Sequence, residues 1–97
     1  MYARVSRYQM KSGSFEEAQR MVEAIRPQIK AIPGMRDWLN VGRADDGKGV
    51  VIALYDSKEA ADAALSSAVK IWAQFSEHLV NQPEVEGYDV VMDMPSD

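Results

Sequence analysis

The sequence predicts an α+β fold in which two helices cover one face of a four-stranded antiparallel sheet. Two stretches have apolar residues at helical spacing, and a capping sequence that contains Ser precedes each of them. Extended stretches rich in Val and Tyr lie before, between and after them, and an Asp-Gly dipeptide separates two of these. The order strand-helix-strand-strand-helix-strand fills the 97 residues, so we expect one domain over residues 1–97.

A strand and a kinked helix are predicted at the start of the chain. Residues 2–11 mix Tyr, Val and Arg without a helical pattern, which indicates a strand. Ser14 and Glu17 then form a capping box, in which each side chain can bond the backbone NH of the other residue. Apolar residues follow at helical spacing, namely Ala18, Met21, Val22, Ile25, Ile29 and Ile32. Pro27 lacks a backbone donor and should kink this helix, which the Pro-Gly pair at 33–34 ends.

A hairpin and a long helix are predicted next. Residues 35–44 and 49–55 form the two arms, and the Asp-Gly pair at 46–47 makes the turn. Residues 56–59, with the sequence DSKE, are a second capping box. The helix that they open has its apolar stripe at helical spacing and is expected to reach about His78.

The last strand is predicted over residues 88–94, after a loop that Gln-Pro and Gly residues indicate. Residues 94–97 are expected to be a frayed tail. The complete arrangement is the split-βαβ or ferredoxin-like order, with the helices on one face of the sheet.

The predicted hairpin pairing gives the sheet two apolar faces. A two-residue turn places Trp38 opposite Tyr55, and Asn40 opposite Ala53, on one face. The other face carries aliphatic side chains, which are Leu39, Val41, Ile52 and Leu54. Helices can cover one of these faces, and an exposed apolar face of this kind indicates a partner. We therefore expect a homodimer that forms through the sheet faces.

The composition excludes several classes of function. The net charge is −4 and the basic residues are scattered, which argues against a nucleic-acid partner. The chain has no Cys and one His, so disulfides and zinc-cysteine sites are excluded and no metal site is expected. The longest apolar run, residues 50–54, is far too short for a membrane span, and the N-terminus does not resemble a signal peptide. We expect a cytoplasmic protein without a membrane partner.

Two short motifs and the order of elements resemble a known superfamily. PGM at 33–35 opens the second strand, and YDSKEAADA at 55–63 leads from an aromatic residue into the second helix. With the β-α-β-β-α-β order, these features resemble the dimeric α/β-barrel superfamily and its antibiotic biosynthesis monooxygenase-like family. The resemblance covers nearly the whole chain, although Tyr55 replaces the more usual Trp. It implies a homodimer, a pocket between sheet and helices, and activities that include cofactor-independent oxidation of aromatic compounds.

The haem-degrading branch of this superfamily does not match residue by residue. Its Asn position falls near Arg7, its Trp position on Ala64 and its His position on Gln74. Trp72 and His78 have the right residue types at the wrong spacing. Haem degradation is therefore not expected, and no cofactor is expected either.

Trp38, Asn40 and Tyr55 are the preferred pocket candidates, because the predicted register places them on one face of the sheet. Asn in the middle of a strand is unfavourable unless its amide has a partner, which a ligand could supply. A polar contact in a dimer interface explains the same residues equally well. Trp72 lies on the apolar stripe of the second helix and is either a core residue or a pocket wall.

Three weaker candidates remain. Phe75 lies at the edge of the apolar stripe, and Arg7 could place a cation near an anionic substrate. His78 is the one possible imidazole base, but it lies about 120° from the centre of the stripe, so a surface role is the better interpretation.

The sequence leaves the function open between two classes. The first is a cofactor-independent monooxygenase that acts on a small aromatic or apolar substrate. The alternative is a dimer without catalytic activity that binds a small apolar or aromatic molecule, or that only associates with itself.

Overall fold

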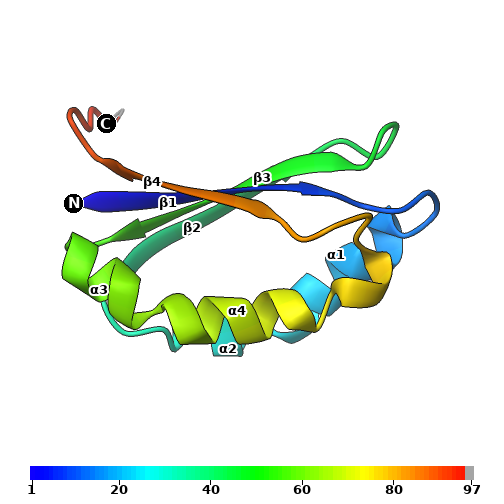
Figure 1. Ribbon diagram of the computed structural model, residues 1–97, viewed down its shortest axis with the longest axis horizontal. Helices are drawn as coiled ribbons and strands as arrows, with labels where there is room; N and C mark the ends of the chain where they lie inside the picture. The colour runs from blue at the N-terminus through cyan, green and yellow to red at the C-terminus, as the bar shows by residue number, and fades with distance from the viewer. Residues whose placement is uncertain (96–97) are drawn as a thin grey trace.

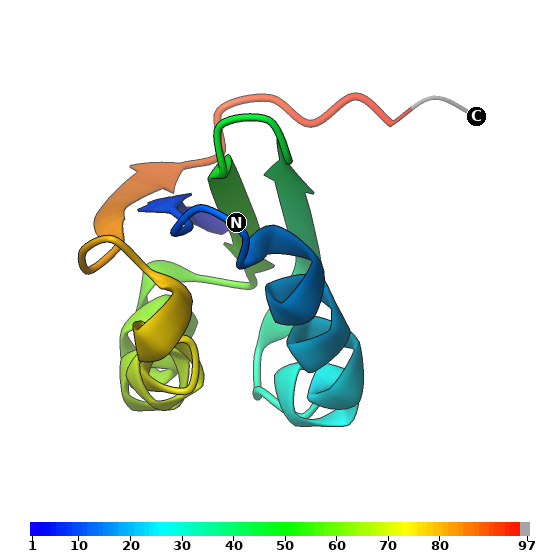
Figure 2. The same ribbon diagram turned by 90° about the vertical axis from the view of Figure 1, so that its right-hand side faces the viewer.

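The computed structural model describes residues 1–95 and confirms the predicted α+β fold (Figure 1). The elements in order are β1 (Tyr2–Gln9), α1 (Phe15–Ala24), α2 (Arg26–Lys30), β2 (Met35–Gly42), β3 (Lys48–Tyr55), α3 (Lys58–Ala63), α4 (Leu65–Ala73), the 3-10 helix η1 (Ser76–His78) and β4 (Glu84–Asp89). The sheet has the strand order β2-β3-β1-β4, and all neighbouring strands are antiparallel. Figure 2 shows that every helix lies on the same side of the sheet.

Both long helices are broken. α1 ends at Ala24 and α2 begins at Arg26, with Pro27 in the first turn of α2, where a missing backbone donor costs nothing. The predicted kink is therefore confirmed. The second predicted helix breaks at Ala64 into α3 and α4, and its last turn is the 3-10 helix that ends at His78.

The two predicted capping boxes are wrong in detail. Ser57, not Asp56, is the N-cap of α3, and its Oγ accepts a hydrogen bond of 3.1 Å from the backbone NH of Ala60. Ser14 precedes α1 but makes no capping bond with its side chain. Its backbone is already helical, at φ −93° and ψ −10°, whereas a capping residue needs an extended backbone to aim its oxygen at the first turn.

The hairpin register differs from the prediction by two residues. Trp38 pairs with Ala53 and Asn40 pairs with Val51, so Tyr55 lies opposite Met35 instead of Trp38. The turn spans residues 44–47 instead of two residues, and an irregularity between Met35 and Asp37 displaces the start of β2. A shift of two residues preserves the side on which each side chain lies, so the predicted division into faces holds.

The last strand runs over Glu84–Asp89, four residues earlier than predicted. Gly87, expected in the loop, lies in this strand and pairs with Arg4, and the Tyr2 ring occupies the space that a side chain at position 87 would need. A Cβ at Gly87 would lie 2.1 Å from the Tyr2 Oη. Residues 90–95 have no regular structure, and the last two residues of the expected frayed tail lie outside the described part of the chain.

The helices cover the face that carries Trp38, Asn40 and Tyr55. The buried core lies between this face and the helices and includes Tyr55, which is 3% exposed, and Phe75. The opposite face, which we call the outer face, carries the aliphatic residues and has no helix above it (Figure 1). Within residues 1–95, no helix has the length and apolar character to cross a membrane, and no cluster of three or more His, Cys, Asp or Glu side chains is arranged to hold a metal ion.

Candidate functional site

A small cavity lies between the inner face of the sheet and the helices. Its volume is about 60 Å³. Since a cavity of about 150 Å³ holds benzene, this closed space has room for a few waters and is smaller than the space that one aromatic ring occupies. Residues of β1, β2 and β3 and of the helices on the inner face line it. Among them are Arg4, Ser6, Tyr8, Trp38, Asn40, Tyr55, Trp72 and Phe75.

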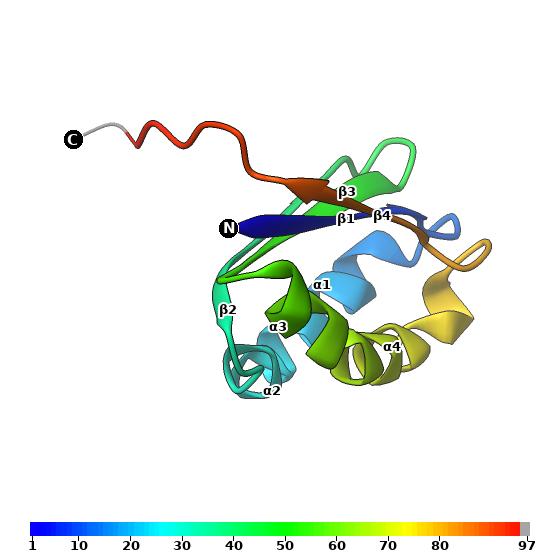
Figure 3. The same cartoon turned by 60° about the vertical axis from the view of Figure 1, so that its left-hand side comes forward.

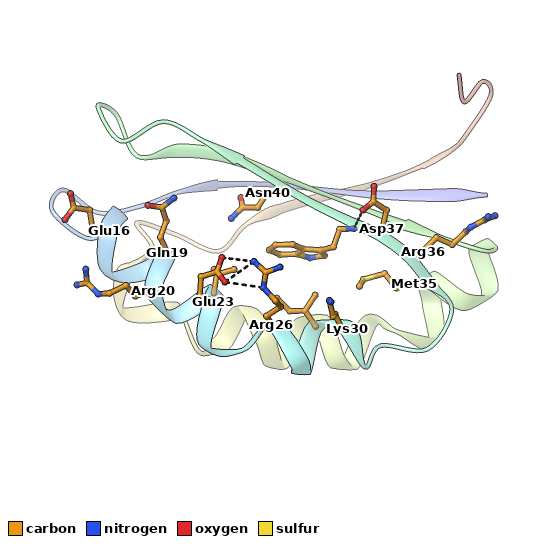
Figure 4. Close-up of a pocket in the computed structure, with 13 residues that line it drawn as sticks. Glu16, Gln19, Arg20, Glu23, Arg26, Lys30, Met35, Arg36, Asp37 and Asn40 are labelled. Atoms are coloured by element: carbon orange, nitrogen blue, oxygen red, sulfur yellow. Dashed lines mark hydrogen bonds and ion pairs between the residues drawn. The ribbon is translucent and has the colours of Figure 1, made fainter. Parts of the chain in front are cut away.

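The cavity borders an open groove of about 1070 Å³ between α1, α2 and β2 (Figure 4). Both spaces are lined by Val22, Ile29, Trp38 and Asn40, so these residues form the boundary between them. Charged side chains surround the groove, and Glu23 and Arg26 pair across one helical turn at 2.8 Å. A ligand would therefore enter from the groove, past Trp38 and Asn40.

A hydrogen bond between Tyr8 and Asn40 lies at one end of the cavity. The Tyr8 hydroxyl donates to Oδ1 of Asn40 over 2.7 Å, although β3 lies between their strands. The ring crosses β3 because Gly49 has no side chain at that point. A Cβ at Gly49 would lie 2.1 Å from the Tyr8 Cζ, and one at Gly42 would lie 3.0 Å from the Tyr8 hydroxyl oxygen. Two glycines in adjacent strands thus create the path that lets Tyr8 reach Asn40.

Aromatic rings form one wall of this end. The Tyr8 and Trp72 ring centroids are 5.6 Å apart, and Trp72 meets Phe75 edge to face at 6.5 Å. These are separations at which aromatic pairs attract each other. A planar aromatic ligand would meet ring faces and edges here, and the amide of Asn40 would still have its NH2 group free to donate, because Oδ1 accepts from Tyr8.

The opposite end of the cavity, near α3, is lined by side chains that can donate hydrogen bonds instead of by aromatic rings. Arg4 reaches it from β1 and donates to Asp62 at 3.0 Å. Ser6 and Tyr55 are 5% and 3% exposed, line the same cavity, and make no side-chain hydrogen bond within residues 1–95. We call Arg4, Ser6 and Tyr55 the donor cluster.

Burial changes the acidity of both tyrosines. Burial raises the pKa of Tyr8 above 10.0, and the hydrogen bond with Asn40 lowers it by less. Burial likewise raises the pKa of Tyr55, and the positive charge of Arg4 opposes that shift. Both hydroxyls are therefore protonated at neutral pH and can act as hydrogen-bond donors.

Five of the seven residues predicted for the site line the cavity. These are Trp38, Asn40, Tyr55, Trp72 and Phe75. Arg7 instead lies on the outer face, where it pairs with Glu86. His78 lies in η1, and no cavity or groove described above includes it in its lining.

Sequence reasoning missed Ser6 as a site residue, and it considered Arg4 and Tyr8 near an anionic substrate without placing them in the pocket. The available signal was their alternation on β1, where a Ser between an Arg and a Tyr shares one face of the strand. Nothing in the sequence showed that Tyr8 would cross β3, because that depends on which residue of β3 pairs with it.

The fold places the chain among small α+β proteins in which helices cover one face of a four-stranded antiparallel sheet. Solved structures of this class match the chain over nearly its full length. The Rv0793 structure from Mycobacterium tuberculosis has a TM-score of 0.74 at 22% identity, covering 97% of this chain and 98% of that one. The NE2512 protein of unknown function from Nitrosomonas europaea has a TM-score of 0.77 at 19% identity, covering 99% and 95%.

A structure named antibiotic biosynthesis monooxygenase has a TM-score of 0.76 at 14% identity, covering 95% of this chain and 100% of that chain. The resemblance predicted from the sequence is therefore confirmed at the level of the fold. The chain matches no protein-family model and no curated protein sequence. Since one fold supports many activities, the function must be argued from the cavity.

Proposed function

We propose that the protein is a cofactor-independent monooxygenase that acts on a single-ring diphenol. The observation that carries this proposal is the boundary between the cavity and the groove, where the exposed amide of Asn40 lies beside Trp38 and has a donor free. The name of the solved structure with the same fold supports the class of reaction. The small volume of the cavity argues against a fused polycyclic substrate.

The proposed reaction balances without a cofactor. A 1,4-diphenol loses a phenolic proton, and dioxygen adds to a ring carbon to form a hydroperoxide. Loss of water then leaves a hydroxyquinone, so one oxygen atom enters the product and the other leaves as water. The diphenol itself supplies all four electrons, which is why neither a metal nor a flavin is required.

Asn40 has the principal role in this scheme. Its NH2 group donates to the phenolate oxygen and to the hydroperoxide that follows, and Tyr8 holds the amide in the orientation that allows this. Trp38 and Trp72 position the ring beside it. The described lining of the cavity contains neither His nor a carboxylate, so the phenolic proton leaves through the groove to water.

Oxygen consumption with hydroquinone tests the proposal. Wild-type protein should accelerate uptake above the spontaneous rate, and Asn40→Ala should lower the acceleration by about 10²–10³-fold, the usual effect of losing one oxyanion donor. The matched control is Asn81→Ala, an exposed residue that does not line the cavity. Equal acceleration by both variants would refute the role of Asn40, and no acceleration by the wild-type protein would refute the activity.

The lack of a base in the described cavity lining favours a second candidate, a protein that binds a small aromatic molecule without transforming it. In that case a diphenol would raise the melting temperature of the protein but would not be consumed faster than in buffer. The same pair of measurements therefore separates the two candidates.

We also propose that two copies of the chain associate through the outer face. The centre of this face is aliphatic, and Leu39 is 52% exposed. Residues 90–95 extend on the side of the sheet away from the helices (Figures 2 and 3). They expose Val91, Met92 and Met94, so this segment adds apolar side chains on the side of the sheet that the helices leave uncovered. A second copy, related by twofold symmetry, would cover both at once.

Sedimentation of the outer-face variant Ile52→Asp tests this association. Ile52 lies at the middle of β3, opposite Leu39, and a buried unpaired carboxylate is strongly unfavourable. The wild-type protein should sediment as a dimer at micromolar concentration, and the variant as a folded monomer. A monomeric wild-type protein would refute the proposal.

A further inference from the structure

We propose that the end of the cavity near α3 binds the carboxylate of a single-ring aromatic acid. The carboxylate would lie against the donor cluster of Arg4, Ser6 and Tyr55, and the ring would lie between Trp38 and Trp72. This inference rests on the proposed function, because it specifies the substrate of that same cavity as a hydroxylated benzoate.

Every member of the donor cluster can donate a hydrogen bond into the cavity. The guanidinium of Arg4 carries five donors, and its NH2 group uses one of them for Asp62. Ser6 and Tyr55 are at least nine-tenths buried, and their hydroxyls make no other hydrogen bond within residues 1–95. No fully buried side-chain oxygen within residues 1–95 lacks a partner, so these two hydroxyls have accessible surface in the cavity and can donate to water or to a ligand there.

The strand pairing places the three side chains on one face of the sheet, with Arg4 between Ser6 and Tyr55 in the register. Arg4 and Ser6 are two residues apart on β1, so they share a face, and Arg4 pairs with Ala53 on β3. Tyr55 follows two residues later on β3, which makes it the diagonal neighbour of Arg4 on the same face. A carboxylate at Arg4 would therefore have a donor on either side of it along the sheet, Ser6 from β1 and Tyr55 from β3.

The local charge favours an anion over a neutral acceptor. Arg4 pairs with Asp62, but Asp62 also accepts from Lys58 of α3 at 3.0 Å, so two cations share one carboxylate. Only one-fifth of the Arg4 side chain is exposed, which limits how far water can screen its charge. The planar guanidinium also matches the two oxygens of a carboxylate, a geometry that a single phenol oxygen cannot use.

The two ends of the cavity are thus suited to different parts of one ligand. Arg4 and Tyr8 are four residues apart, or about 13 Å along β1, and their side chains reach into the space between. A ligand that spans this length would have its carboxylate at the donor cluster and a hydroxyl toward Asn40, at the boundary with the open groove. A diphenol that also carries a carboxylate satisfies both ends.

Calorimetric titration with benzoate and benzamide tests the inference without turnover. The two probes have the same shape, but only benzoate carries a charge at pH 7. We expect the wild-type protein to bind benzoate at least about tenfold more tightly than benzamide. Ser6→Ala and Tyr55→Phe, which each remove one oxygen atom, should weaken benzoate binding at least about threefold. Arg4→Gln should abolish the preference for benzoate.

Arg43→Gln is the matched control for the loss of a cation. Arg43 pairs with Asp46 at 2.9 Å in the hairpin turn, as Arg4 pairs with Asp62, but it does not line the cavity. Its variant should keep the wild-type preference. Equal binding of benzoate and benzamide, no binding of benzoate, or an unchanged preference in Arg4→Gln would each overturn the inference.

Oxygen uptake separates this inference from the proposed function. If hydroquinone is consumed but 2,5-dihydroxybenzoate is not consumed faster, the proposed function stands and the carboxylate site is wrong. If benzoate binds as expected but neither diphenol is consumed, the carboxylate site stands as a binding site and the proposed monooxygenase activity is wrong.

Discussion

Replacement of Gly49 by Ala should damage the site and the core together. The added Cβ would lie 2.1 Å from the Tyr8 Cζ and 2.2 Å from its hydroxyl oxygen, whereas ordinary contacts begin near 3.4 Å. The ring must therefore move by more than about 1 Å, and the 2.7 Å bond to Asn40 cannot survive that movement. Overpacking costs about 1–3 kcal/mol and the lost hydrogen bond about 0.5–1.5 kcal/mol. The total is about 1.5–4.5 kcal/mol of unfolding free energy.

Urea unfolding followed by circular dichroism, at a fixed protein concentration, measures this loss. Tyr8→Phe serves as a partial control and should cost only about 0.5–1.5 kcal/mol, because it removes the hydroxyl and keeps the ring. The decisive comparison is Gly49→Ala in a Tyr8→Ala background. With the ring gone, alanine should be neutral or stabilising by about 0.4–1 kcal/mol, since the φ of Gly49 is not positive. An equal cost in both backgrounds would refute the proposed path of Tyr8 across β3.

Two further predictions concern stability. Ser57→Ala should lower the free energy of unfolding by about 0.5–2 kcal/mol because it removes the cap of α3. Ser14→Ala should change it by less than about 0.5 kcal/mol, because Ser14 makes no capping bond. Urea unfolding of both variants checks this contrast. Burial raises the pKa of Tyr8 and of Tyr55 above 10.0, so the folded chain keeps protons that the unfolded chain loses. Their contribution to stability is complete below pH 10 and is lost as the pH rises through the folded pKa values. Replacing both with Phe should therefore reduce the fall in stability between about pH 9.5 and about pH 11.5, and an identical fall in the double variant would contradict this origin.

The order of elements could be predicted because each has a local signal. Helical spacing, Pro27 and the glycine-containing turns act within a few residues, so the sequence alone indicates where helices and strands follow one another. The side of the sheet on which Trp38 and Asn40 lie was also predictable, because alternation along a strand does not depend on the exact register.

The wrong predictions concern features that depend on local backbone angles or on contacts between residues far apart in the sequence. The capping role of Ser14 depends on the backbone angle that the preceding turn imposes, and the sequence does not specify that angle. Gly87 has the residue type of a loop, and its place in a strand depends on the contact with Tyr2, which is far away in the sequence. The contact between Tyr8 and Asn40 was not predicted for the same reason. It requires that Gly49 lies opposite Tyr8 in the register of β1 and β3.

Alternation along β1 links the two proposed surfaces of the molecule. Arg4, Ser6 and Tyr8 face the cavity, whereas Val5 and Arg7 face the outer side. A slip of one residue in this strand would exchange the two sets, placing Arg4, Ser6 and Tyr8 on the outer face and Val5 and Arg7 in the cavity. The cavity and the outer face therefore depend on the same register. Because a second copy on the outer face would bury Val5 only in the native register, dimer formation would also stabilise the arrangement that keeps the donor cluster inside the cavity.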